Sequence, residues 1–247
     1  MTTGTDDRPV AIVAGGSTGI GASVARRLDR EGYRVVVVGA KSVDEGNAVA
    51  AELDGATFLQ ADLSDAGAPA QVVAHVESAH GRLDALVYAA GRTARIPHPD
   101  IHAVTDDVWE PILRLNVLGP WHFVQAAEPL LRKSGNGNVV VVGALAGVDV
   151  GGSSIPYAVS KAAVHHMCKL LGGALGPEIR VNAVAPGFIE TRWTADWDDF
   201  RAQITEKAPL RRTGHPDEVA ELVVGLMRAT YVTGQVVVAD GGLSLLP

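Results

Sequence analysis

A tyrosine and a lysine four residues apart are the pair in this sequence best suited to proton chemistry. Tyr157 and Lys161 occur in the segment YAVSK, where the spacing of apolar residues predicts a helix. Side chains four residues apart on a helix share one face, so the phenol and the ammonium can meet. A nearby cation favours the phenolate and lowers the pKa of a tyrosine from its usual value of about 10. The pair could therefore exchange protons near neutral pH, although such a spacing also arises by chance.

A glycine-rich turn near the start of the chain predicts a dinucleotide site. The apolar run 10–14 leads directly into GGSTGIG, which contains Gly15, Gly19 and Gly21, and a helical pattern follows. Glycines let backbone N–H groups approach a pyrophosphate, and the amino end of the helix adds a favourable dipole. A tight turn without a ligand is the less favoured interpretation.

The end of the second predicted strand bears on the choice of nicotinamide cofactor. NAD sites usually place a carboxylate there, about 20 residues beyond the glycine turn, to bind the ribose hydroxyls. This chain has Ala40, Lys41 and Ser42 at that position, and no acid precedes Asp44. Because Lys41 and Ser42 could hold a 2′-phosphate, we expect NADP(H), with NAD(H) as the alternative. Lys41 could also be an ordinary solvated lysine.

Strands alternate with helices along most of the chain. Apolar runs predict strands over residues 10–14, 35–38, 57–60, 85–88, 139–142, 180–184 and 235–239. Helical patterns cover residues 22–32, 43–53, 68–80, 107–131, 156–175 and 216–227. The alternation predicts an α/β fold with a doubly wound parallel sheet. Without a linker or repeat, we expect a single domain over residues 1–247.

One insertion, near residues 188–215, is too long for a simple connection. It contains a short predicted helix, 198–207, and two tryptophans, Trp193 and Trp197. Long insertions of this kind usually cover a binding site, so we interpret it as a substrate lid. A contact surface between subunits is the alternative.

Composition and charge exclude several classes of function. Hydrophobic residues make up 47% of the 247 residues, enough for a sizeable core, and the formal net charge of −7 disfavours nucleic acid as a partner. A lone cysteine, Cys168, fits a reducing compartment and excludes an internal disulfide. The opening MTTGTDDRPV is unlike a signal or transit peptide, and no apolar run reaches the roughly 18 residues of a membrane helix. The histidines show no metal-ligand spacing. We therefore expect a cytoplasmic protein that binds a small-molecule substrate, with no metal, membrane or nucleic-acid partner.

These motifs together resemble the short-chain dehydrogenase/reductase family, in its branch of about 250 residues. The resemblance extends over residues 10–242. Besides the glycine turn and Tyr-x-x-x-Lys, it rests on Asp62-Leu63, Gly91, Asn116, the segment from Asn182 to Gly187, Thr233-Gly234 and Asp240-Gly241-Gly242. It implies a Rossmann-type, seven-stranded parallel sheet in the order 3-2-1-4-5-6-7, and assembly into a homotetramer or homodimer.

The resemblance also implies roles for individual side chains. Tyr157 would be the general acid/base, Lys161 would bind the nicotinamide ribose and lower the tyrosine pKa, and Asn116 would hold a proton-relay water. The cofactor site expected from the glycine turn, the second strand and the resemblance comprises Gly15, Ser17, Thr18, Gly19, Ile20, Gly21, Ala40, Lys41, Ser42, Asp62, Leu63, Ala90, Gly91, Tyr157, Lys161, Pro186, Gly187, Ile189 and Thr191.

The chain departs from the family thirteen residues before the tyrosine, where a serine normally binds the substrate oxygen. Ala144 occupies that position. Loss of one such donor typically lowers the rate by about 10²–10³, unless another group replaces it. Ser153 and Ser154 could replace it as catalytic residues, or could be ordinary loop serines. The expected substrate pocket comprises Ala144, Ser153, Ser154, Tyr157, Trp193 and Trp197.

Three functions are compatible with this departure. One is an NADP-dependent reductase of a substrate that needs little help at its oxygen, such as an imine, an activated enone or a chelated ketone. Another is an ordinary ketone/alcohol oxidoreductase in which Ser153 or Ser154 is the donor. The last is a cofactor-binding protein with a non-redox role, as a cyclase, scaffold or regulator. The presence of Asn116, Tyr157 and Lys161 together favours an active oxidoreductase.

Overall fold

Runs of β-branched residues, buried on both faces, form the centre of a single sheet. The computed structural model describes residues 7–245, so the first six residues of the polar, acidic opening segment lie outside the described residues. All neighbouring strands are parallel, in the order β3-β2-β1-β4-β5-β6-β7, which confirms the predicted topology. The strands are β1 (Val10–Ala14), β2 (Arg34–Gly39), β3 (Thr57–Gln60), β4 (Ala85–Tyr88), β5 (Gly137–Val142), β6 (Ile179–Pro186) and β7 (Val236–Ala239).

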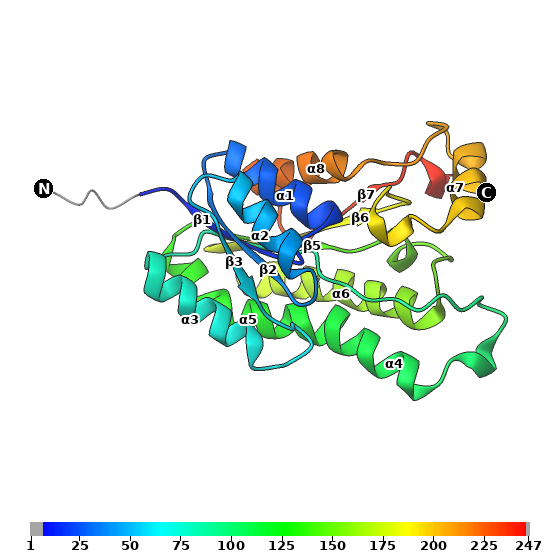
Figure 1. Ribbon diagram of the computed structural model, residues 1–247, viewed down its shortest axis with the longest axis horizontal. Coiled ribbons are helices and arrows are strands. Elements are labelled where there is room, and N and C mark those ends of the chain that lie inside the picture. The colour runs from blue at the N-terminus through cyan, green and yellow to red at the C-terminus, as the bar shows by residue number, and fades with distance from the viewer. Residues whose placement is uncertain (1–6, 246–247) are drawn as a thin grey trace, which may run out of the picture.

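Helices cover both faces of the sheet (Figure 1). One face packs against α1 (Gly19–Arg30), α2 (Val43–Glu52) and α8 (Pro216–Arg228). The other face packs against α3 (Ala68–His80), α5 (Gly119–Lys133) and α6 (Ile155–Ala174). Alternate residues of β1 belong to the two cores, as expected when both faces of a strand are buried. The strand order reverses at β1, between β2 and β4, which is where ligands bind in sheets of this kind.

The predicted helix over residues 107–131 is divided in the structure. α4 (Asp106–Leu113) is followed by a π-helical turn, η2 (Arg114–Leu118), and then by α5. Pro120 has no N–H to donate to the carbonyl of Asn116, four residues earlier, so a regular α-helical bond cannot form there. The π-turn therefore lies at Asn116, and such turns are frequent at functional sites.

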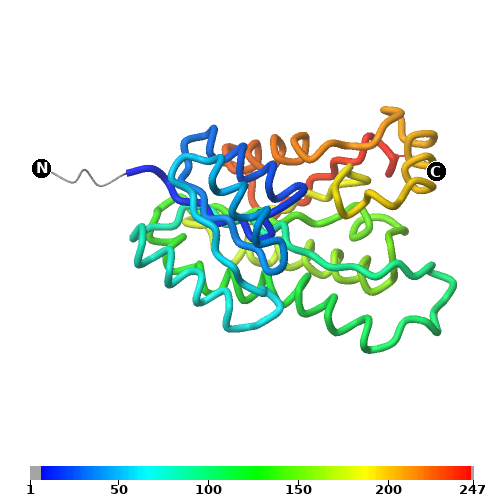
Figure 2. Tube along the Cα trace, viewed as in Figure 1, coloured from blue at the N-terminus to red at the C-terminus, as the bar shows by residue number. Residues whose placement is uncertain are grey.

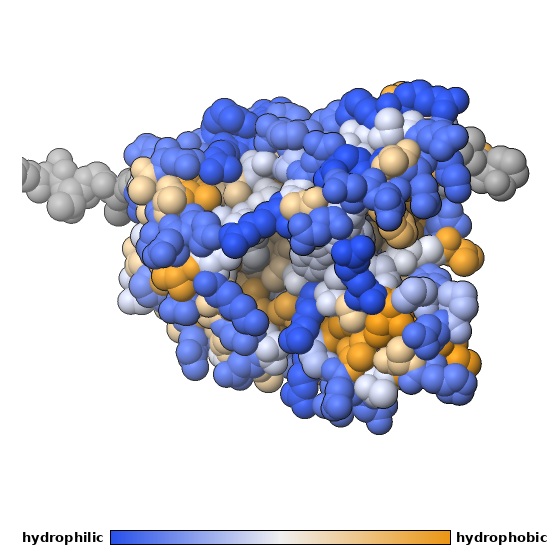
Figure 3. Space-filling model, turned by 45° about the vertical axis from the view of Figure 1, so that its right-hand side comes forward, coloured by the Kyte–Doolittle hydropathy of each residue, from blue (hydrophilic) through white to orange (hydrophobic). Residues whose placement is uncertain are grey.

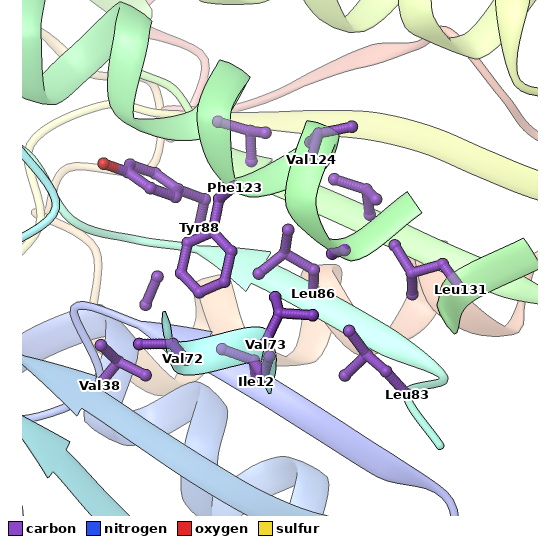
Figure 4. Packing of buried hydrophobic residues seen from close by; sticks show 14 of the residues in the cluster. Ile12, Val38, Val72, Val73, Leu83, Leu86, Tyr88, Phe123, Val124 and Leu131 are labelled. Carbon is purple, nitrogen blue, oxygen red and sulfur yellow. The ribbon is translucent and has the colours of Figure 1, made fainter. Parts of the chain in front are cut away.

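A buried tyrosine ties this turn to the sheet. The Tyr88 hydroxyl donates to the carbonyl oxygen of Leu115 over 2.8 Å. Its ring meets that of Phe123 edge-on, with centroids 6.4 Å apart, inside the core shown in Figure 4. Burial raises the pKa of Tyr88 above its usual range, so the hydroxyl stays a donor. The end of β4 and the π-turn are thereby held together.

The insertion folds beside the carboxyl end of the chain, as the tube in Figure 2 shows. It contains the short helices η4 (Arg192–Thr194) and α7 (Asp198–Lys207), and Leu210 N donates to the carbonyl of Gly241 over 3.1 Å. A β-bridge pairs Ile189 with Gly214 and closes the insertion at its base. Three further short helices are η1 (Ile101–Ala103), η3 (Leu145–Gly147) and η5 (Leu243–Leu245). Between residues 7 and 245, no helix is long and apolar enough to cross a membrane.

Candidate active site

A cleft of about 710 Å³ opens at the carboxyl ends of the central strands. In the space-filling view the surface is hollowed between its upper and lower parts (Figure 3). Every residue of the expected cofactor site lines this cleft. The structure therefore brings together residues that are far apart in the chain, from the turn after β1 to the segment before η4. Whether each of them contacts a cofactor stays a prediction. The cleft is also lined by Arg92, Glu110, Pro111, Arg114, Leu115, Val142, Gly143, Arg192 and Thr194, among others.

The glycine turn is closely packed under the cleft. Gly15 has a positive φ of 78°, and a Cβ there would lie 2.5 Å from the backbone N of Ala90. A Cβ on Gly21 would lie 2.0 Å from the carbonyl oxygen of Gly15. The N–H groups of Gly15 and Gly16 both donate to the carbonyl of Val38, over 2.8 and 3.0 Å. Side chains are thus excluded at Gly15 and Gly21, which lets the backbone of the turn approach a ligand closely.

An unpartnered hydroxyl supports a polar ligand at this turn. Ser17 Oγ is buried and has no hydrogen-bond partner within residues 7–245. It points under Gly39, where a Cβ would lie only 2.2 Å from it. Buried polar atoms are almost always bonded, so an orphaned hydroxyl at a glycine turn fits a phosphate-bearing cofactor. The residues present therefore suit a dinucleotide.

Asp62 and Leu63, two residues of the expected cofactor site, line the cleft after β3. The exposed Asp62 accepts hydrogen bonds at Oδ1 from the Ser64 hydroxyl over 2.7 Å and from the Ser64 backbone N over 3.0 Å. The Ser64 bonds, with smaller contributions from Lys41 and Arg92, hold the pKa of Asp62 below its usual range. Asp62 is thus a charged carboxylate, and Leu63 beside it is buried.

The tyrosine and lysine lie on α6, which begins at a serine cap. Ser154 Oγ accepts a hydrogen bond from the backbone N of Tyr157, and Pro156 occupies the first turn, where its missing N–H costs nothing. Lys161 is buried, and its Nζ donates to the carbonyl of Val142 over 2.9 Å. The same Nζ lies 5.7 Å from the centroid of the Tyr157 ring. The two side chains therefore meet, as the helical spacing predicted.

Burial controls the pKa of both groups. It raises the pKa of Tyr157 to about 12 and lowers the pKa of Lys161 to about 8. The structure therefore does not show the expected lowering of the Tyr157 pKa by the lysine. The reason is that desolvation of a phenolate outweighs the attraction of an ammonium held by a backbone carbonyl. At neutral pH the phenol is a proton donor.

Asn116 braces the chain that follows β4. Its Nδ2 donates to the carbonyl of Arg92 and to Ser160 Oγ, both over 2.9 Å, and its Oδ1 accepts from the N of Arg92 over 2.8 Å. A Cβ on Gly91 would lie 3.6 Å from Asn116 Oδ1 and 3.7 Å from both Lys161 Nζ and Trp193 Cη2. The π-turn, α6 and the insertion thus converge on Gly91.

Residue 144 has no hydroxyl, and a histidine supports its backbone. The backbone N of Ala144 donates to Nε2 of the buried His165 over 3.4 Å. A Cβ on Gly143 would lie 1.9 Å from that nitrogen, so only glycine fits beside the ring. Burial lowers the pKa of His165 to about 4, so the imidazole is neutral, and its Nδ1 has no hydrogen-bond partner in the described part of the chain. His165 was not among the residues expected at the site. The glycines at positions 143 and 147, on either side of Ala144, are the feature of the sequence that allows its ring to approach.

The structure does not bring Ser153 or Ser154 into the cleft. Ser154 is fully buried, and its hydroxyl caps α6. The hydroxyls of Ser153 and Thr93 bond to each other, and the carbonyl of Ser153 accepts from Ile96 N over 2.9 Å. Neither serine lines the cleft, because both hydroxyls take part in bonds that hold the loop and the start of α6, and the donor role expected for Ser153 or Ser154 stays a prediction.

The two tryptophans of the insertion have different positions. Trp193 lines the cleft. Trp197 does not; it packs between Phe188 and Phe200, with centroids 6.3 and 6.0 Å away, and the Arg95 guanidinium lies 5.0 Å from its ring centroid. The predicted substrate contact of Trp197 is therefore not found, and its place in the insertion is structural.

No group of three or more potential His, Cys, Asp or Glu metal ligands occurs in the part of the chain that the structure describes.

The chain is similar to known enzymes over almost its whole length. A family model described as enoyl-(acyl carrier protein) reductase matches residues 14–244. "Granaticin polyketide synthase putative ketoacyl reductase 2" of Streptomyces violaceoruber is 52% identical over 250 residues, covering 100% of both chains. Dehydrogenase/reductase SDR family member 4 of Homo sapiens is 35% identical over 243 residues, covering 94% of this chain and 86% of that protein. A crystal structure of a variant actinorhodin polyketide ketoreductase with NADPH has a TM-score of 0.88 and 29% identity, covering 97% of this chain and 98% of that one.

Proposed function

The chain belongs to the short-chain dehydrogenase/reductase family of NAD(P)-dependent oxidoreductases, and we propose that it is an NADPH-dependent reductase of a carbonyl, an enone or an imine. The observation that carries this proposal is the convergence of Asn116, Lys161 and Trp193 on Gly91, beside Tyr157 in the cleft. The relatives named as reductases favour this function over a non-redox role.

Proton delivery is the step that this chain's own residues perform. When bound, the nicotinamide cofactor supplies the hydride for the substrate carbon. A carbonyl oxygen then gains negative charge, and Tyr157 donates a proton to it, since its pKa of about 12 keeps the phenol protonated. As the family resemblance implies, Lys161 would hold the nicotinamide ribose, and Asn116 would order the water that returns a proton toward the tyrosine. Asn116 is kept in place by its bonds to Arg92 and Ser160.

The choice of NADP(H) over NAD(H) rests on charge at the end of β2. Lys41 and Ser42 line the cleft there, and an acid is absent until Asp44. An NAD site would place a carboxylate at this position. The relative crystallised with NADPH adds support.

The substrate class follows from the missing hydroxyl at residue 144. With alanine in that position and both loop serines engaged elsewhere, the cleft offers the substrate oxygen one donor fewer than usual. We therefore propose a substrate whose oxygen or nitrogen needs little extra stabilisation, such as an imine, an activated enone or a chelated ketone. The names of two relatives make a ketone of an acyl or polyketide chain the first one to test.

Three further expectations stay proposals. The chain forms one domain over residues 1–247 with a lid near 188–215, acts in the cytoplasm, and assembles into a homotetramer or homodimer. Exposed apolar side chains on the surface of η2 and α5, Leu118 and Trp121, support an assembly.

The test is NADPH oxidation measured against panels of ketones, enones and imines. Tyr157→Phe is expected to lower turnover by about 10²–10⁴, the usual contribution of a positioned acid, without weakening NADPH binding. Tyr231→Phe changes an exposed tyrosine away from the cleft and should behave as the unchanged protein. Tight NADPH binding with no turnover on any panel would contradict the enzyme and favour a non-redox role.

A further inference from the structure

An arginine of the insertion reaches across the mouth of the cleft to α2. Arg192 begins η4, lines the cleft, and its Nη1 lies 2.6 Å from Oε1 of Glu45 in the first turn of α2. The two residues are 147 positions apart in the chain. Both side chains are exposed, to 75% and 43%. An exposed ion pair of this kind contributes little to stability, so either partner can exchange it for a ligand.

The position of Arg192 over the phosphate turn is set by its neighbour. Thr191 packs on the glycine turn, since a Cβ on Gly19 would lie 3.3 Å from Thr191 Cγ2. The next residue, Arg192, therefore begins close to the turn. Its guanidinium extends past the turn toward α2, where its partner Glu45 lies only three residues beyond Ser42. Lys41 and Ser42 line the cleft at the same end.

We propose that Arg192 is a cofactor-binding residue that contacts the 2′-phosphate of NADP, together with Lys41 and Ser42, in place of its ion pair with Glu45. This inference rests on the proposed preference for NADP(H). A guanidinium suits the task because its N–H groups match phosphate oxygens in pairs. Glu45 then acts as the competitor: its carboxylate holds the guanidinium when the phosphate is absent and repels the phosphate when it arrives.

The position distinguishes this contact from one to the pyrophosphate. The pyrophosphate belongs at the glycine turn and the amino end of α1. Arg192 bonds instead to the first turn of α2, beyond the end of β2, where the 2′-phosphate is expected. The insertion would thereby contribute to the choice of cofactor as well as to the substrate pocket.

The experiment measures nucleotide binding by calorimetry, without any turnover. The probes are adenosine 2′,5′-bisphosphate and 5′-ADP, which differ in the presence of the 2′-phosphate. We expect Arg192→Ala to weaken binding of the bisphosphate about tenfold or more, as for loss of a charge-assisted bond, and to change 5′-ADP binding less than about twofold. Glu45→Gln should tighten bisphosphate binding about threefold, since the competitor is removed.

Arg26→Ala is the matched control. Arg26 also pairs with a glutamate of α2, Glu52, over 2.7 Å, but it does not line the cleft. Arg26→Ala changes the net charge by the same amount as Arg192→Ala, and it should leave the affinities for the bisphosphate and for 5′-ADP unchanged.

The results separate this inference from the proposed function. If the unaltered protein binds neither nucleotide, both proposals fall. If it prefers 5′-ADP, the NADP preference and the role of Arg192 fall together, while a reductase using NADH stands. If it prefers the bisphosphate but Arg192→Ala has no effect, or weakens both nucleotides equally, the inference alone is overturned. A loss in Glu45→Gln as large as that in Arg192→Ala would show that the pair only braces the cleft, and would also overturn it.

Discussion

The side chain at residue 144 limits the hydrogen bonds that the cleft can offer to a substrate. Ala144 lines the cleft with a methyl group, and its backbone N–H already donates to His165. Neither group is therefore available to a substrate oxygen, and Tyr157 carries the donor role proposed for this end of the cleft. The rate of reduction should therefore change when one hydroxyl is added at residue 144.

Restoring that hydroxyl is expected to help difficult substrates most. Ala144→Ser should raise kcat/KM for unactivated ketones by up to about 10²-fold, the usual value of one oxyanion donor. Imines and activated enones should gain little, because less negative charge develops on their reacting atom. Steady-state kinetics with both classes would check this, with the exposed Ala202→Ser on α7 as a control. An equal change for both classes would contradict the account.

At the scale of elements, a buried arginine joins the sheet to the end of a helix. Arg180 of β6 donates through Nη1 to the carbonyls of Leu226 and Ala229, over 3.1 and 2.8 Å, and through Nη2 to that of Met227 over 2.7 Å. The carbonyls of Leu226 and Met227 lie in the last turn of α8 and that of Ala229 at its cap, where a cation meets the favourable end of the helix dipole. β6 ends at the cleft, and α8 packs on α1, which follows the glycine turn. The contact of Arg180 with α8 therefore helps to hold the glycine turn in place relative to the rest of the site.

Removing the guanidinium should destabilise the fold. Arg180→Met removes this donor from the buried carbonyls of Leu226 and Met227, whereas the carbonyl of Ala229 still accepts from Val232 N over 3.2 Å. We expect the free energy of unfolding to fall by about 2–4 kcal/mol. Arg228→Met provides the comparison, because Arg228 is exposed and its ion pair with Glu31 should be worth at most about 1 kcal/mol. Denaturant unfolding of both variants would measure the difference. Equal losses would argue against a special role for Arg180.

At the scale of the whole molecule, buried neutral histidine makes stability depend on pH. The folded pKa of His165 is about 4, below its ordinary value of about 6.5, because burial disfavours the imidazolium. Between these two values the unfolded chain binds the proton and the folded chain does not, so stability falls as pH falls through this window. The pKa of the partly buried His80 is lowered as well and acts in the same direction. The pKa of Glu218 is lowered to about 2, so the stability that this carboxylate contributes is lost only as the pH falls further, when it becomes protonated.

The contribution of His165 can be isolated with a neutral replacement. His165→Gln retains an acceptor for the Ala144 N–H but cannot gain a proton. From pH 6.5 to 4 the unaltered protein should lose up to roughly 3 kcal/mol more stability than the variant, at about 1.4 kcal/mol per pKa unit. Unfolding curves across this range would measure the loss. Parallel pH profiles for the two proteins would show that His165 is not protonated on unfolding.

Features that depend on neighbouring residues were predictable from the amino-acid order alone. The strands over residues 10–14, 57–60 and 85–88 have the predicted bounds. The first and last of these are short apolar runs that are buried throughout, as expected for central strands of a parallel sheet, whereas β3 at the edge of the sheet is only partly buried. The glycine turn and the Tyr157–Lys161 pair followed from spacing on one element. The order of the strands came from the family resemblance.

Features that depend on contacts between distant segments were decided only by the tertiary structure. The hydroxyls of Ser153 and Ser154 are adjacent in sequence to the site, yet Thr93 and the start of α6 engage them. The tyrosine pKa rises because burial, a property of the whole packing, outweighs one neighbouring charge. His165 reaches Ala144 across 21 positions, and Arg192 reaches Glu45 across 147. The sequence of neighbouring residues determined the helices, the strands and the spacing of the Tyr157–Lys161 pair. Packing determined which side chains face the cleft, because a side chain bonds to the groups that the fold places beside it.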